Sequence, residues 1–262
     1  MFKGFTIQYP DYECITPQTG HSFFVRSLNV QDEEKLKGSL VTPTKVTEHL
    51  NRCLFNCITK KPDTITDFRS FLQNTTLKDR EALMYAVYHI TYEEIRNYDI
   101  RCGNCRKEYP VTISASSTFN INPYPDKDIL DVRKKVKLPI TETVTAIIRQ
   151  PSLEQEVNAL KELSSRPGVS VDLISETLVI DRFEEDIPEI TDPRVYNDRL
   201  DILEAYLSLP SKDKRAIYAE YIESFGKYGI ELKMKSFCQH CGNEEVVSIS
   251  LVEQFFRMVY SS

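Results

Sequence analysis

Two pairs of cysteines have the spacing that metal-binding proteins use. Cys102 and Cys105 lie in the stretch RCGNCRKEYPVTIS, and Cys238 and Cys241 lie in SFCQHCGNEEVVSIS. Structural zinc is usually held tetrahedrally by four cysteine or histidine ligands, and a C-x-x-C turn presents two of them together. Each pair alone therefore supplies half of such a site. We predict one structural zinc ion bound by both pairs, although 132 residues separate Cys105 from Cys238.

Other chemistries remain open for these cysteines. A redox dithiol of the thioredoxin type opens a helix, whereas both pairs here are followed by β-prone residues, YPVTIS and EEVVSIS. Four free thiols without a metal are a further alternative. His240 lies inside the second pair and is a candidate ligand in place of a cysteine. The matching residue of the first pair is Asn104, which favours a solvent-exposed turn for His240.

The other cysteines and histidines are interpreted as structural. Cys53 and Cys57 lie one helical turn apart among apolar residues, which is typical of small buried side chains. Cys14 has no apparent partner, and seven cysteines are a poor fit to a secreted disulfide framework. The remaining histidines are isolated in the sequence: His21, His49 and His89.

No catalytic motif is present in the sequence. It contains no glycine-rich phosphate loop, no nucleophile elbow and no H-E-x-x-H, and it has only eight glycines. Adjacent acidic residues such as Glu93 and Glu94 point in different directions on a helix and are interpreted as solvated. We therefore expect no catalytic residue, no organic cofactor site and no enzymatic activity.

An internal repeat gives a reason for the long gap between the cysteine pairs. At an offset of 134, DFRSFLQNTTLKDREALMYAV from Asp67 matches DILEAYLSLPSKDKRAIYAEY from Asp201. After a two-residue insertion, an offset of 136 aligns Cys102 with Cys238, Cys105 with Cys241 and Glu108 with Glu244. A weaker match at an offset of 123 aligns Arg26 with Arg149 and Glu33 with Glu156. We interpret the pattern as a duplication.

Each copy is predicted to contain a β-hairpin front, amphipathic helices and a cysteine hairpin, so the expected fold class is α+β. The first copy is expected over residues 1–124, a linker over 125–139 and the second copy over 140–262. Packing of the copies about a pseudo-twofold axis would bring the cysteine hairpins together.

Local patterns place the elements that would position the cysteines. Residues 4–9 and 21–28 alternate like the arms of a hairpin. Thr42-Pro43 is a helix start, and helices are also expected over 78–94 and over 212–225, the latter ending near Gly226 or Gly229. Residues 114–139 have no clear period, and residues 181–194 read as an acidic loop.

Composition bears on the class of partner. The formal net charge of −6 weighs against a nucleic-acid binder, and the basic stretch VRKKVK at 132–137 is interpreted as solvated linker. No apolar run approaches the roughly 20 residues that cross a bilayer, and MFKGFTIQYPDYEC lacks the apolar core of a signal peptide. An intracellular protein without membrane contact is the expectation.

The ending CQHCGNEEVVSISLVEQFFR is similar to that of the baseplate hub or hub-assembly proteins of T-even-type myophages, in which a cysteine knuckle precedes an acidic pair, a strand and Phe-Phe. The fronts FFVRSLNVQDEEKLKGS and IIRQPSLEQEVNALKEL resemble the opening of the same family. The first copy departs from the pattern, with Phe119-Asn120 in place of Phe-Phe.

The resemblance implies a non-enzymatic component of a contractile-tail baseplate, formed in the host cytoplasm and acting in hub assembly or remaining in the virion tail. Its expected partners are other tail proteins, such as hub or tape-measure subunits. The alternative is a zinc-hairpin module that binds nucleic acid or regulates phage transcription, using the 132–137 stretch.

Overall fold

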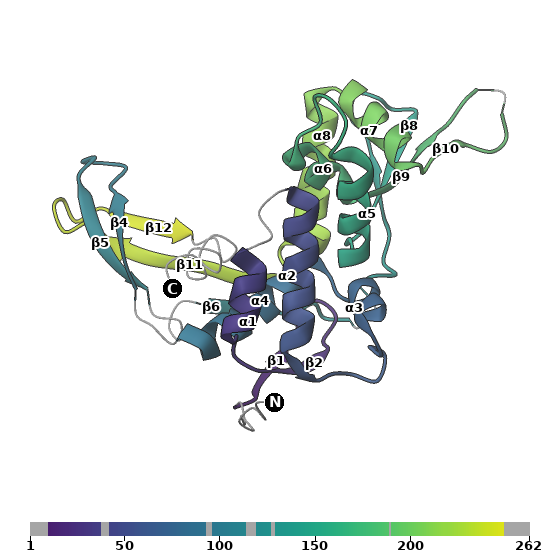
Figure 1. The fold of residues 1–262 in the computed structure, drawn as a ribbon. Helices are drawn as coiled ribbons and strands as arrows, with labels where there is room; N and C mark the ends of the chain where they lie inside the picture. The colour runs from purple at the N-terminus through teal and green to yellow at the C-terminus, as the bar shows by residue number, and fades with distance from the viewer. Residues whose placement is uncertain are drawn as a thin grey trace.

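The computed structural model describes residues 10–37, 42–92, 96–113, 119–126, 129–188 and 190–248. It is a mixed α+β structure in which helices pack on small antiparallel sheets. Two bodies of helices and sheet lie against each other, and a pair of long β-hairpins projects from them to one side (Figure 1). The cysteine pairs lie in the turns of these two hairpins.

Residues 12–113, here called the first half, form a three-stranded sheet with order β1-β2-β3, four helices and one hairpin. The elements are β1 (Tyr12–Ile15), β2 (Ser22–Val25), α1 (Val30–Lys37), α2 (Pro43–Cys57), β3 (Ile58–Lys60), α3 (Phe68–Asn74), α4 (Leu77–Tyr92), β4 (Arg96–Arg101) and β5 (Glu108–Ile113).

Helix α2 shows how the local sequence dictates these elements. The Thr42 side chain accepts a hydrogen bond from the Lys45 amide, and Pro43 occupies the first helical position, where no N–H is needed. Leu50, Cys53, Leu54 and Cys57 form its buried stripe, as the helical spacing predicts. This stripe packs into a core with the aromatic residues of β2 and α3.

Residues 134–248, here called the second half, repeat this order of elements with additions. The elements are β7 (Lys134–Lys137), β8 (Val144–Ile148), α5 (Leu153–Leu163), α6 (Val171–Leu178), β9 (Ile180–Glu185), β10 (Arg194–Tyr196), α7 (Arg199–Ser208), α8 (Ser211–Tyr221), a π-helical turn η1 (Ile222–Gly226), β11 (Gly229–Phe237) and β12 (Glu244–Ser248). The sheet order is β10-β9-β8-β7, and β6 (Phe119–Asn122) pairs with β11.

Buried carboxylates at matching positions hold the front of each sheet. Asp79 at the start of α4 accepts the Gln18 amide at 2.8 Å, in the loop that leads to β2. Asp213 at the start of α8 accepts the amides of Ile140 at 2.8 Å and Thr141 at 3.0 Å, in the loop that leads to β8. The two halves thus share a tertiary contact as well as an order of elements.

The two halves are joined by α5 and by the loop between β1 and β2. Helix α5 packs on α2 and α3, and Leu153 is buried in the core of the first half. Gln18 is buried and donates to the carbonyls of Phe225 and Tyr228, both at 3.1 Å. The packing is one-sided, because no contact of similar extent joins α1 to α6 or α7 in the described part of the chain.

Three local expectations need adjustment. The predicted linker over 125–139 contains β7, whose edge position in the second sheet gives it hydrogen-bonded order. The predicted hairpin arm at 4–9 lies outside the described residues, and β2 pairs instead with Tyr12–Ile15. The acidic segment 181–194 is not all loop, because its first residues form β9. Period-two patterns in such short strands are too brief to be distinguished from loop sequence.

Candidate metal centre

Hairpins β4–β5 and β11–β12 present the four cysteines and are here called the cysteine arm (Figure 1). Both hairpins have the same register. Arg101 faces Glu108 next to the first cysteine turn, and Phe237 faces Glu244 next to the second. The offset of 136 that aligns the cysteines therefore also aligns the strand pairing around them.

The two turns repeat the same backbone hydrogen bonds. The Cys102 amide donates to the Lys107 carbonyl at 2.9 Å, as the Cys238 amide donates to the Asn243 carbonyl at 2.9 Å. Each turn ends on a left-handed residue, Arg106 with φ 59° and Gly242 with φ 71°. The conformation that turns the chain back after each pair is therefore the same.

The four sulfur atoms meet between the hairpins, all within 4.8 Å of one another. Cys102 Sγ lies 3.7 Å from Cys241 Sγ, and Cys105 Sγ lies 3.6 Å from Cys238 Sγ. A tetrahedral zinc with Zn–S bonds of about 2.3 Å places its sulfurs about 3.8 Å apart. A disulfide needs about 2.05 Å, and all four cysteines are free. The geometry fits one metal ion.

Polar contacts around the sulfurs fix the two turns against each other. Glu245, on β12, accepts a hydrogen bond from the Gly103 amide in the opposite turn and another from the Asn243 side chain at 3.2 Å. The Gly103 amide is the leading cause of the lowered pKa of Glu245. His240 contacts the Glu108 carbonyl at 3.1 Å, so its ring also bridges the hairpins. It is exposed and stands outside the group of four sulfurs, as predicted.

The thiols differ in proton affinity although they form one cluster. The hydrogen bond from the Asn243 amide lowers the pKa of Cys241; burial opposes it, but hydrogen bonds with the three neighbouring thiols lower the pKa further, to about 7. The Cys105 amide lowers the pKa of Cys102, but burial and hydrogen bonds with Cys241 and Cys105 outweigh it and raise the value to about 12. A cation that binds all four sulfurs would displace protons from the cluster.

The apolar core of the cysteine arm is small. Beside the buried cysteines it contains Tyr109 and Val111, with Ile100 packed against them. The main cores of the two halves lie elsewhere and involve none of the four cysteines. Among the described residues, the site therefore lies beside a small apolar cluster, which is typical of structural metal sites in small modules.

One family model matches the chain over residues 9–257, under the description T4 bacteriophage base plate protein. The match covers both halves and both cysteine hairpins. The chain belongs to this phage base plate family. No curated protein and no solved structure matches it. A structural role in a phage tail follows from the family.

In this base plate protein, the remaining cysteines lie in the core, as predicted for Cys53 and Cys57. Cys14, Cys53 and Cys57 are buried in the first half among apolar side chains. Burial, with the charge of Asp79, raises the pKa of Cys14 to about 12, so this thiol stays protonated at neutral pH. No described helix is long and apolar enough to span a bilayer.

Sequence reasoning missed two residues, one at the cysteine site and one at the contact between the two halves. Glu245 was grouped with Glu244 as part of an acidic pair, and only the facing hairpin reveals its contact with Gly103. Gln18 lies between the two expected hairpin arms, although the carbonyls of its partners Phe225 and Tyr228 are about 200 positions away in the sequence. No local pattern carries either signal, because both partners come from the other half.

Proposed function

We propose that the chain is a non-enzymatic hub component of a contractile-tail baseplate, acting in hub assembly or remaining in the hub. In this proposal one zinc ion, bound by Cys102, Cys105, Cys238 and Cys241, joins two duplicated halves. The convergence of the four sulfurs from hairpins 132 residues apart is the observation that carries it. Shared element order, matching turns and the paired Asp79 and Asp213 contacts support the duplication.

Zinc is the metal that suits this ligand set. Four thiolates in tetrahedral array are a common structural zinc site, and no ligand position is left open for chemistry. The ion would close a loop of 132 residues between Cys105 and Cys238 and so couple the ends of the two halves. The arm would then act as one rigid projection rather than as two separate hairpins.

Purification of the tagged chain from infected cells tests the role in the tail. We expect hub or tape-measure proteins to co-purify with the wild-type chain, and a Cys238→Ser chain to recover less of them if the arm is the contact surface. An exposed Lys233→Ser variant on the same hairpin serves as the control. Recovery of no structural tail protein with the wild-type chain would refute the proposal.

No feature of the described residues favours nucleic-acid binding. In the basic stretch 132–137, Arg133 pairs with Asp181 at 3.3 Å and Lys135 with Glu184 at 3.7 Å. These cations are partly neutralised by β9, and the chain as a whole is acidic. Binding to nucleic-acid phosphates needs clustered cations that are free to displace the counterions of those phosphates.

A further inference from the structure

Helix α5 covers the first half through an apolar residue and a carboxylate one turn apart. Leu153, the first residue of α5, is fully buried in the core of the first half, and its amide donates to the Thr75 carbonyl at 3.0 Å. Glu156 then pairs with Arg80 near the start of α4, with 2.9 Å between Arg80 Nη2 and Glu156 Oε1. This joint holds the two halves together.

The first half carries a matching pair of residues on α1. The offset of 123 aligns Leu153 with Val30 and Glu156 with Glu33. Local structure supports the alignment: Asn29 and Asp32 exchange capping hydrogen bonds of 3.2 and 2.9 Å at the start of α1, and Ser152 and Gln155 do the same at the start of α5. The surroundings differ, however, because Val30 is 73% exposed and Leu153 is 0% exposed.

The second half carries the matching receptor surface. The offset of 134 aligns Arg80 with Lys214 on α8, which has no ion-pair partner within the described ranges. Its ammonium lies 4.7 Å from the centre of the Tyr206 ring. Beside it opens a pocket of about 630 Å³.

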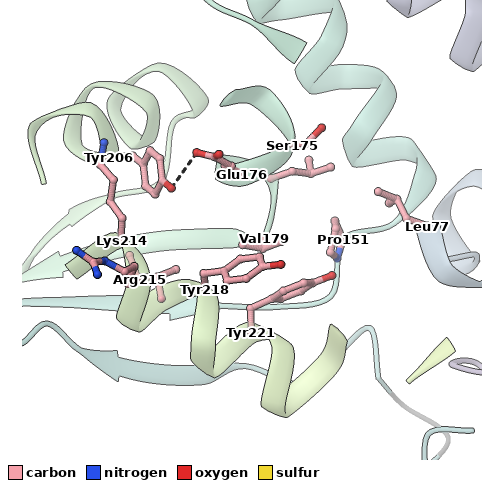
Figure 2. Close-up of a pocket in the computed structure, with 12 residues that line it drawn as sticks. Leu77, Pro151, Ser175, Glu176, Val179, Tyr206, Lys214, Arg215, Tyr218 and Tyr221 are labelled. Carbon is pink, nitrogen blue, oxygen red and sulfur yellow. Dashed lines mark hydrogen bonds between the residues drawn. The ribbon is translucent and has the colours of Figure 1, made fainter. Parts of the chain in front are cut away.

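The lining of this pocket combines apolar surface with the cations Lys214 and Arg215 and with one carboxylate, Glu176, which accepts a hydrogen bond from the Tyr206 hydroxyl at 3.0 Å. Lys214 and Arg215 lie at one end, and Leu77 and Pro151 lie at the other (Figure 2). Tyr218 is 64% exposed, and Leu207 on the neighbouring helix is 53% exposed. Leu207 aligns with Gln73, which contacts α5 through Glu154 at 3.1 Å in the first half. The α7–α8 surface therefore resembles the surface of the first half that α5 covers, but no described helix covers it.

We propose that the chain associates head to tail, with α1 of one copy docked on the α7–α8 surface of the next. Val30 would pack at the pocket as Leu153 packs in the first half, and Glu33 would pair with Lys214 as Glu156 pairs with Arg80. One oxygen of Glu33 accepts from Tyr92 at 2.9 Å, which leaves the other for Lys214. The proposal continues an interface already present inside the chain and does not depend on the metal or on a hub role.

Such an interface is heterologous, because the two copies contribute different surfaces. It therefore generates closed rings if the rotation between copies closes and open chains if it does not. It also makes a prediction that no symmetric dimer makes. A copy with a damaged α1 surface and a copy with a damaged α7–α8 surface should still form one intact joint when mixed.

Sedimentation velocity on the full-length, metal-loaded chain at up to about 100 µM tests the proposal, since weak interfaces lie in the micromolar range. We expect concentration-dependent oligomers for the wild type. Val30→Asp and Lys214→Glu should each weaken association about 30-fold, as expected for a charge buried without a partner. An equimolar mixture of the two variants should form a dimer and nothing larger.

Lys35→Asp on α1 and Lys212→Glu on α8 are matched controls at exposed positions that do not line the pocket, and they should associate like the wild type. Circular dichroism would show that all variants are folded. A wild type that remains monomeric at every concentration would overturn the proposal. So would a variant mixture that remains monomeric, or single variants that associate as strongly as the wild type.

Discussion

Removal of the metal should release the cysteine arm while the two main cores stay folded. Among the described side chains of the arm, the buried apolar ones beyond its cysteines are Tyr109 and Val111. Full burial of such a side chain contributes about 1.5–3 kcal/mol, so the two together contribute roughly 3–6 kcal/mol. A structural zinc site contributes on the order of 10 kcal/mol to the folding of a small module. The metal is thus expected to be the largest single stabilising contribution in the arm.

Hydrogen exchange read by mass spectrometry measures this effect for each segment. After chelation we expect amides in residues 96–113 and 233–248 to exchange at least about 1,000-fold faster, which corresponds to a loss of about 4 kcal/mol. Amides of α2 and α4 should change little, because their core does not include the four cysteines. Cys238→Ser should reproduce the pattern without chelator.

A control separates loss of the metal from damage to the protein. Cys53→Ser changes a buried cysteine of the main core and should lower global stability without selective exchange in the arm. Unchanged exchange of the arm after chelation would refute the reasoning, because it would mean that packing and hydrogen bonds hold the hairpins without a metal.

Three further predictions follow from individual residues. Gln18→Ala should lower the free energy of unfolding by about 2 kcal/mol, because the carbonyls of Phe225 and Tyr228 lose their donor. The control Gln31→Ala, at an exposed position, should change the free energy of unfolding by less than about 0.5 kcal/mol. Urea denaturation measures both variants, and equal effects would contradict the role of Gln18. Gly242→Ala should lower the melting temperature of the metal-loaded chain by an amount equivalent to about 1 kcal/mol. The cost comes from the positive φ of Gly242, and it stays this small because no atom crowds the added methyl group. An unchanged melting temperature would show that the turn tolerates a side chain there, as it does at Arg106. Burial raises the pKa of Asp213, but hydrogen bonds from Thr141 and Ile140 outweigh it, and the net pKa is lowered. The stabilising effect of the Asp213 carboxylate is therefore complete above the unfolded pKa of about 3.9 and is lost as pH falls through the folded pKa. The difference in stability between wild type and Asp213→Asn should shrink below about pH 4, and a difference that stays constant with pH would refute this assignment.

The convergence of the four cysteines could be predicted from the sequence because its signal is local and doubled, whereas their binding of a metal stays a prediction. Two identical cysteine spacings at a constant offset indicated that equivalent hairpins exist, and the structure brings their sulfurs together. Helices α2, α4 and α8 were predicted within a few residues, since caps and apolar stripes mark them. In each case neighbouring residues were enough to specify the element.

What the sequence did not predict depends on contacts between the halves. Strand β7 was interpreted as linker because KKVK is mostly charged, and only its pairing with β8 makes it a strand. The one-sided packing of α5 on α2 and α3 departs from the reciprocal contacts that a twofold axis would require for whole halves. Val30 and Leu153 occupy matching positions with opposite exposure, which no alignment of the two halves reveals.

The metal content of the purified chain tests the central claim most directly. Elemental analysis should be made on the wild type, Cys102→Ser and Cys238→Ser, with Cys14→Ser as a control in the main core. The shared site predicts one zinc per wild-type and Cys14→Ser chain, and loss of zinc from both Cys102→Ser and Cys238→Ser. A wild type without zinc, or zinc retained at full occupancy by either knuckle variant, would contradict it.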